Sequence, residues 1–196
     1  MNRSPIFRVV ITAFLAAISY VLMFLSFPVI PLIPYLKIDF SDLPILIGFF
    51  ILGPLGGVMV AIVRSLLYLV STGTDIASLI GVGTNFLASM AVSFPAYFIL
   101  KGGSGIKPTI WKSILAILTS TLVLTVLLSI ANYFVILPVY LNVIGMDIGM
   151  SVSKYVVIGV IPFNIIKGVL VVGVFSILYR RMYSWVQLNN KKYKKI

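Results

Sequence analysis

The chain has 196 residues and a net charge of +11; 61% of its residues are hydrophobic and only 10% are charged. A soluble domain carries roughly 25% charged residues, so this composition excludes a water-soluble protein and predicts an integral membrane protein. The chain has no cysteine or histidine, which excludes thiol nucleophiles, Ser-His-Asp triads and the usual zinc sites, and its basic residues lie mainly in tails and one loop, a pattern that argues against nucleic-acid binding.

The first half of the chain predicts three helical spans. Residues 7–27 form the first, which lacks a small-residue cleavage site and is therefore an uncleaved span rather than a signal peptide. Three prolines, at positions 28, 31 and 34, end it, and residues 35–42 form a loop. An apolar segment at 43–52 stops at the turn Gly53-Pro54-Leu55-Gly56-Gly57, and residues 58–70 follow as the third span. Both are short for a full crossing, which predicts burial against neighbours or local bilayer thinning.

The second half predicts three further spans joined by longer loops. A loop at 71–83 precedes the fourth span at 84–100, and a flexible basic loop follows at 101–108. The fifth span covers 111–137 and is stopped by Pro138, after which residues 139–154 form a partly apolar loop. The sixth span covers 156–179 and contains Pro162, which is suited to the first turn of a helix that restarts there. No long internal repeat is visible, so an inverted-repeat transporter is not supported.

The lysines and arginines orient this arrangement. With the N-terminus inside, eleven of the fifteen basic residues are cytoplasmic, Lys37 and Lys154 are outside, and Arg64 and Lys167 lie within spans. All four acidic residues fall in outer loops: Asp39, Asp42, Asp75 and Asp147. This bias follows the positive-inside rule. It predicts an all-α integral membrane protein: one substrate-binding domain over residues 1–196, a six-transmembrane-helix bundle with both termini cytoplasmic and a short basic tail at 180–196.

Lys167 is the most informative residue, because it lies inside an apolar stretch with no acidic residue near it in sequence. A charge in the bilayer costs at least a few kcal/mol and generally marks a functional site. Asn164 lies one helical turn before it on the same face, and Asn132 lies near the outer end of the fifth span. We expect these three side chains to surround a polar, non-acidic small molecule in the outer half of the bundle.

Other residues on the outer side are candidates for the same pocket. They are the loop residues Asp39 and Phe40, Asn85 at the start of the fourth span, and the aromatic residues Tyr68, Tyr133 and Phe163. Asn85 alone is equally explained by an interhelical hydrogen bond worth about 1 kcal/mol. Arg64 is better explained by a structural pairing with an outer-loop aspartate or a backbone carbonyl than by ligand contact.

The chain lacks the parts of an energy source. It has no G-x-x-x-x-G-K-[ST] motif for ATP and no carboxylate inside a predicted span, which weakens ion coupling. Ala13 and Ala17 lie four residues apart on the first span, with Ala16 beside them, and such small residues let another helix approach closely. The sequence therefore indicates a binding protein that docks to a partner, with no catalytic or metal site.

Four segments resemble the substrate-binding S component of an energy-coupling factor (ECF) transporter, specifically its riboflavin-binding member. They are Lys37-Ile38-Asp39-Phe40-Ser41-Asp42-Leu43-Pro44, Gly53-Pro54-Leu55-Gly56-Gly57, Ser129-Ile130-Ala131-Asn132-Tyr133-Phe134-Val135-Ile136-Leu137-Pro138 and Ile161-Pro162-Phe163-Asn164-Ile165-Ile166-Lys167-Gly168.

The resemblance implies riboflavin uptake from outside a bacterial cell membrane, with FMN as a second ligand, and no enzymatic activity. It implies that Asn132, Asn164 and Lys167 hold the pyrimidine edge of the flavin and that the first outer loop is a lid. It also implies a transmembrane coupling protein, contacted by Ala13 and Ala17, two cytoplasmic ATPases, and an S component that topples in the membrane. The alternatives are an S component for another vitamin such as thiamine, an intramembrane enzyme, or a non-transport membrane subunit.

Overall fold

Helices make up most of the computed structural model, which describes residues 4–31, 33, 35–101 and 109–192. In chain order its elements are α1 (Pro5–Phe24), β1 (Phe27–Pro28), β2 (Lys37–Ile38), α2 (Asp42–Leu52), α3 (Pro54–Thr72), α4 (Ile76–Lys101), α5 (Ile110–Ala131), η1 (Asn132–Ile136), α6 (Leu137–Asn142), α7 (Val152–Tyr155), η2 (Val156–Val160) and α8 (Ile161–Lys192). The predicted basic loop after Lys101 and the last residues of the tail lie outside the described part.

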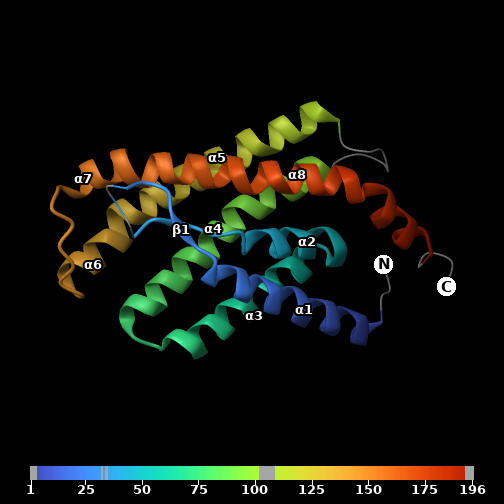
Figure 1. Ribbon diagram of the computed structural model, residues 1–196, viewed down its shortest axis with the longest axis horizontal. Coiled ribbons are helices and arrows are strands. Elements are labelled where there is room, and N and C mark those ends of the chain that lie inside the picture. The colour runs from blue at the N-terminus through green and yellow to red at the C-terminus, as the bar shows by residue number, and fades with distance from the viewer. Residues whose placement is uncertain (1–3, 32, 34, 102–108, 193–196) are drawn as a thin grey trace.

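The helices run side by side along one direction. In Figure 1, α5 and α8 lie on one side, α1 and α3 on the other, and α2 and α4 between them. The start of α1 and the end of α8 lie at the same end, and the β1–β2 ribbon, α6 and α7 lie at the opposite end. Five helical stretches are long and apolar enough to cross a membrane, whereas the 11-residue α2 is shorter.

Two helices begin earlier than the sequence predicted. Gly53 alone, with φ of +87°, separates α2 from α3, and Pro54 occupies the first turn of α3. The third span is therefore 19 residues long, and the expectation that it is short was wrong. The predicted loop at 71–83 was also too long, because α4 begins at Ile76. Asp75 stabilises that start by accepting hydrogen bonds from the Ser78 hydroxyl (2.6 Å) and amide (3.2 Å).

The predicted stop at Pro138 was wrong, because the fifth span continues through it to Asn142. Proline has no N–H for the bond to residue i−4, and a turn widened by one residue tolerates this loss. The π-turn η1 ends two residues before Pro138, and η2 ends two residues before Pro162. Helical structure thus continues from Val152 through Pro162, so the helix does not restart there, and the loop predicted at 139–154 shrinks to 143–151.

The segment between α1 and α2 carries the one departure from all-α structure among the described residues. It forms a two-stranded antiparallel ribbon in which Phe27 pairs with Ile38 and Pro28 with Lys37. Ile33, between the strands, is only 2% exposed and packs against η2. Gly159 makes this packing possible, because a Cβ there would lie 2.3 Å from Ile33 Cδ1. The ribbon is therefore docked on the second π-turn.

Aromatic side chains fill the bundle toward the end where α8 finishes. The ring of Phe50 lies 5.3 Å from that of Tyr97, 5.0 Å from Phe175 and 4.3 Å from Tyr179. These residues come from α2, α4 and α8, and all are buried. The three helices are thus joined by a continuous apolar core at this end.

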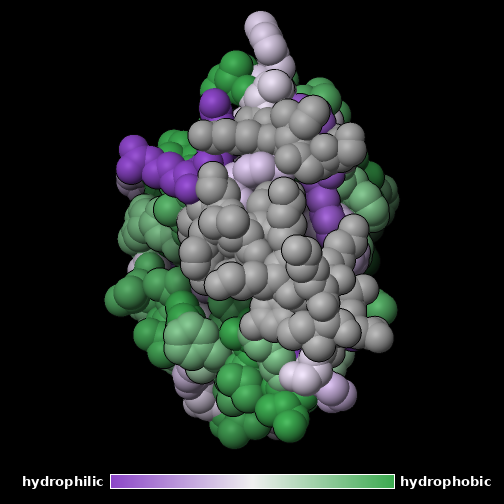
Figure 2. Space-filling view, turned by 90° about the vertical axis from the view of Figure 1, so that its right-hand side faces the viewer, coloured by the Kyte–Doolittle hydropathy of each residue, from purple (hydrophilic) through white to green (hydrophobic). Residues whose placement is uncertain are grey.

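The outside of the bundle is apolar along its length. Large hydrophobic side chains of the long helices are exposed, among them Val9, Val70, Phe98 and Leu122. Figure 2 looks onto the end where α1 begins, and hydrophobic residues cover the flanks while hydrophilic ones gather in places at this end. Such a distribution is expected of a protein surrounded by lipid.

Candidate functional site

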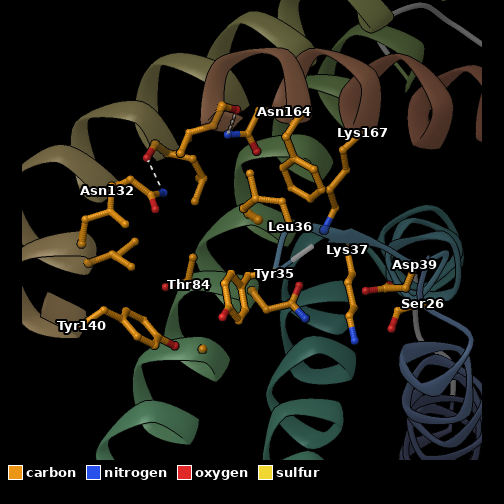
Figure 3. Close-up of a pocket in the computed structure, with 18 of the residues that line it drawn as sticks. Ser26, Tyr35, Leu36, Lys37, Asp39, Thr84, Asn132, Tyr140, Asn164 and Lys167 are labelled. Carbon is orange, nitrogen blue, oxygen red and sulfur yellow. Dashed lines mark hydrogen bonds between the residues drawn. The ribbon is translucent and has the colours of Figure 1, made fainter. Parts of the chain in front are cut away.

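A cavity of about 580 Å³ lies at the end of the bundle that carries the ribbon, between α1, α3, α4, α6, α8 and the two π-turns. This volume falls within the range of about 300–1,000 Å³ typical of small-molecule sites. Its wall combines aromatic with polar side chains (Figure 3). The polar and aromatic lining residues are Ser26, Tyr35, Lys37, Asp39, Tyr68, Thr84, Asn85, Asn132, Tyr140, Tyr155, Phe163, Asn164 and Lys167.

Asn132 and Asn164 line the cavity in the same way, although they come from different helices. Asn132 Nδ2 donates a hydrogen bond to the Leu128 carbonyl (2.7 Å), and Asn164 Nδ2 donates one to the Val160 carbonyl (2.9 Å). These bonds fix both carboxamides against their own helices (Figure 3). Each side chain keeps its Oδ1 and a second N–H for another partner. The sequence correctly predicted that these two residues share a pocket.

Lys167 also lines this cavity, but it has the acidic partner that the sequence analysis did not find. Its Nζ lies 3.3 Å from Asp42 Oδ2, and both residues are buried. Asp42 begins α2 and is fully buried, so its placement in an outer loop was wrong. The sequence did not reveal this pair, because Asp42 begins α2 and Lys167 lies on α8, far along the chain.

Asp42 belongs to a wider buried network that includes Arg64. The Ser89 hydroxyl donates to Asp42 Oδ1 (2.5 Å), and Arg64 Nη1 lies 3.9 Å from the same oxygen. Arg64 also donates to the hydroxyls of Ser41 (3.0 Å) and Ser89 (3.1 Å). Arg64 therefore joins α3 to α4 and to the start of α2, and it lies beside an aspartate, as the sequence analysis expected of a structural residue. Neither Arg64 nor Asp42 lines the cavity.

The remaining predicted pocket residues divide into two groups. Asp39, Asn85, Tyr68 and Phe163 line the cavity, whereas Phe40 and Tyr133 do not. The sequence analysis missed the other polar and aromatic lining residues, Ser26, Tyr35, Lys37, Thr84, Tyr140 and Tyr155. The sequence analysis assigned Tyr140 to the loop at 139–154, and Tyr155 lies directly after that loop. If the helix is continued past Pro138, Tyr140 lies one turn after Ile136, on the face that lines the cavity.

Ala13 and Ala17 lie on α1 away from the cavity, and both are exposed, whereas Ala16 is buried in the bundle. They present small side chains at the surface of a helix that faces outward. The expected partner contact therefore has an accessible face.

An apolar helical bundle that encloses a cavity lined by polar and aromatic side chains has the architecture of a membrane-embedded binding protein. The model of the family "ECF transporter, substrate-specific component" matches residues 7–179. The chain belongs to this family.

Individual relatives agree with the family assignment. The riboflavin transporter RibU of Staphylococcus aureus is 42% identical over 189 residues, which cover 95% of this chain and 96% of that protein. The riboflavin transporter FmnP of Bacillus subtilis is 34% identical, over 92% and 94% of the two chains. A solved S component of a bacterial ECF transporter superposes with a TM-score of 0.71 at 40% identity, covering 91% of this chain and 96% of that one.

Proposed function

We propose that this chain is the riboflavin-specific S component of an ECF transporter in a bacterial cell membrane, and that it captures the vitamin in the cavity described above. The matching arrangement of Asn132 and Asn164 carries the proposal. The pyrimidine edge of riboflavin offers two carbonyl acceptors on either side of an N–H donor. A carboxamide Oδ1 supplies the complementary acceptor for the N–H, and the Lys167 ammonium together with the remaining carboxamide N–H groups supplies donors for the two carbonyls.

The rest of the cavity suits the other parts of a flavin. Tyr68 and Phe163 are aromatic surfaces for the ring system, and Asp39 and Asn85 are polar partners for the hydroxylated chain. FMN is a second candidate ligand for the same site. The two named relatives, both riboflavin transporters, favour riboflavin over thiamine, the alternative vitamin.

We further propose that six helices cross the membrane, with both termini in the cytoplasm. These are the five long helical stretches and the shorter α2. The common position of the start of α1 and the end of α8 supports this topology, and so do Lys101, Lys112 and Arg181 in helix ends there. The cavity then opens toward the outside. The chain has no catalytic role in this proposal, and its partners are a membrane coupling protein and two ATPases.

Ligand capture is tested on purified protein in detergent. Riboflavin added to the protein should lose its fluorescence at a one-to-one ratio, and mass spectrometry of the extracted ligand should identify an unmodified flavin. Protein that leaves riboflavin fluorescence unchanged but binds thiamine would support the alternative S component. Conversion of the ligand to a product would indicate an enzyme.

The site is tested by Asn164→Ala. The variant should bind riboflavin more weakly by roughly 1–3 kcal/mol, because a buried hydrogen-bonding group of the ligand loses its partner. Asn142→Ala, in an exposed position at the end of α6, is the matched control and should bind as the wild type does. Equal affinity of the two variants would remove Asn164 from the site.

A further inference from the structure

Lys167 depends on Asp42 as its charge partner more than Asp42 depends on Lys167. Asp42 has other partners, because Ser89 donates to its Oδ1 and Arg64 lies beside the same oxygen. Lys167 has one ion pair among the described residues, the 3.3 Å contact with Asp42 Oδ2. Removing Lys167 would therefore leave Asp42 paired, whereas removing the Asp42 charge would leave a buried ammonium without its counterion.

A buried ammonium without a counterion is unstable in its charged, buried form. Its desolvation costs several kcal/mol, and it is relieved by losing the charge or by moving toward water. Arg64 and Lys37, which lines the same cavity, are cations and can only repel it. Asp39, the other nearby acid, faces the cavity, and its Oδ1 already accepts a hydrogen bond from the Ser41 amide (2.8 Å).

The groups that hold Asp42 are themselves fixed. Ser89 lies on α4 and Arg64 on α3, and both are fully buried. The Ser41 hydroxyl accepts from Arg64, and the Ser41 carbonyl accepts from the Ser19 hydroxyl of α1 (2.6 Å). Four helices thus determine the position of the Asp42 carboxylate to which Lys167 is bound.

We propose that Asp42 is a positioning residue for ligand recognition: without touching the ligand, it holds the Lys167 ammonium charged and aimed into the cavity. Ser89 and Arg64 act behind it by fixing its carboxylate. This inference rests on the proposed riboflavin site and adds the residues that determine its strength.

A double-mutant cycle of riboflavin dissociation constants tests the proposal, using Asp42→Asn, Lys167→Met and the double variant. Asp42→Asn should weaken binding about 10- to 100-fold, the range expected for loss of a charge-assisted hydrogen bond. In the Lys167→Met background the same change should have almost no further effect, because the residue through which it acts is gone. The visible absorption bands of flavin bound to Asp42→Asn should resemble those of flavin bound to Lys167→Met.

A milder pair of variants covers the case in which Asp42→Asn fails to fold. Ser89→Ala removes the donor to Asp42 and should weaken binding by less, again only when Lys167 is present. Ser93→Ala is its matched control, because Ser93 is an equally buried serine one turn further along α4 and its hydroxyl has no hydrogen-bond partner among the described residues. Ser93→Ala should leave the dissociation constant unchanged.

The outcomes separate this inference from the function on which it rests. Wild-type protein that does not bind riboflavin would refute the proposed function itself. If the wild type binds but the two substitutions weaken binding independently and multiply, Asp42 acts by general folding and the inference is wrong. Unchanged affinity and absorption bands in Asp42→Asn would also overturn it, since Asp39 would then suffice as the counterion.

Discussion

At the level of single residues, the two buried cations Lys167 and Arg64 occupy different positions relative to the cavity. Lys167 lines the cavity, whereas Arg64 lies behind the wall and bonds to Ser41 and Ser89. The sequence analysis separated these two residues, because Lys167 follows Asn164 by one turn and Arg64 was expected to pair with an outer-loop aspartate or a backbone carbonyl. The sequence did not reveal Asp42, since an aspartate that precedes an apolar segment reads as the end of a loop.

Arg64 is expected to support stability rather than recognition directly. Arg64→Ala should lower the free energy of unfolding by about 3–5 kcal/mol, because it leaves the Asp42 carboxylate short of a buried partner. Thermal unfolding in detergent measures the change. Arg181→Ala, at an exposed position on α8, is the control and should unfold near the wild-type temperature. Similar unfolding of the two variants would mean that the network contributes little to stability.

At the level of elements, the two π-turns explain the errors in the helix ends predicted near Pro138 and Pro162, and they contribute residues to the cavity wall. Composition and hydropathy predicted every long helix, but proline rules placed an end at Pro138, where the helix widens and continues. The widening depends on tertiary packing, because η1 and η2 meet each other and the ribbon segment packs on η2. Local sequence does not contain that information.

Docking of the ribbon on η2 is testable at Gly159. Gly159→Ala places a methyl group 2.3 Å from Ile33 Cδ1 and should displace the Ile33 side chain. The overpacking costs about 1 kcal/mol, which corresponds to roughly a fivefold change in the rate of riboflavin dissociation. We expect riboflavin to dissociate faster, as measured by stopped-flow fluorescence.

The neighbouring helix offers a matched control for that change. Gly173→Ala on α8 meets open space and should leave the dissociation rate unchanged. Combining Gly159→Ala with Ile33→Ala should relieve the collision itself. If Gly159→Ala releases riboflavin at the wild-type rate, the ribbon is not a lid whose closure depends on this contact.

At the level of the whole molecule, binding and partner contact are assigned to different surfaces. The cavity lies at one end of the bundle, and Ala13 and Ala17 lie on the outward face of α1. Ala17→Trp should therefore leave riboflavin affinity unchanged and stop uptake, because the large ring prevents close approach of a partner helix. Binding to purified protein and uptake of labelled riboflavin by cells measure the two effects.

A tryptophan elsewhere on the outer surface separates docking from a general effect of bulk. Leu122→Trp on α5 replaces a side chain that is already exposed, and both binding and uptake should persist. Uptake that continues in Ala17→Trp would exclude this face of α1 as the partner contact.

The aromatic packing around Phe50 closes the interior at the end remote from the ribbon. A cargo molecule in the cavity therefore meets no lengthwise passage in the described part of the chain, and the route left to it is the mouth through which it came. Delivery to the cell interior then requires either that this mouth be brought to the other leaflet or that Phe50, Tyr97 and Tyr179 separate, and these two routes differ in whether the bundle stays intact during transport.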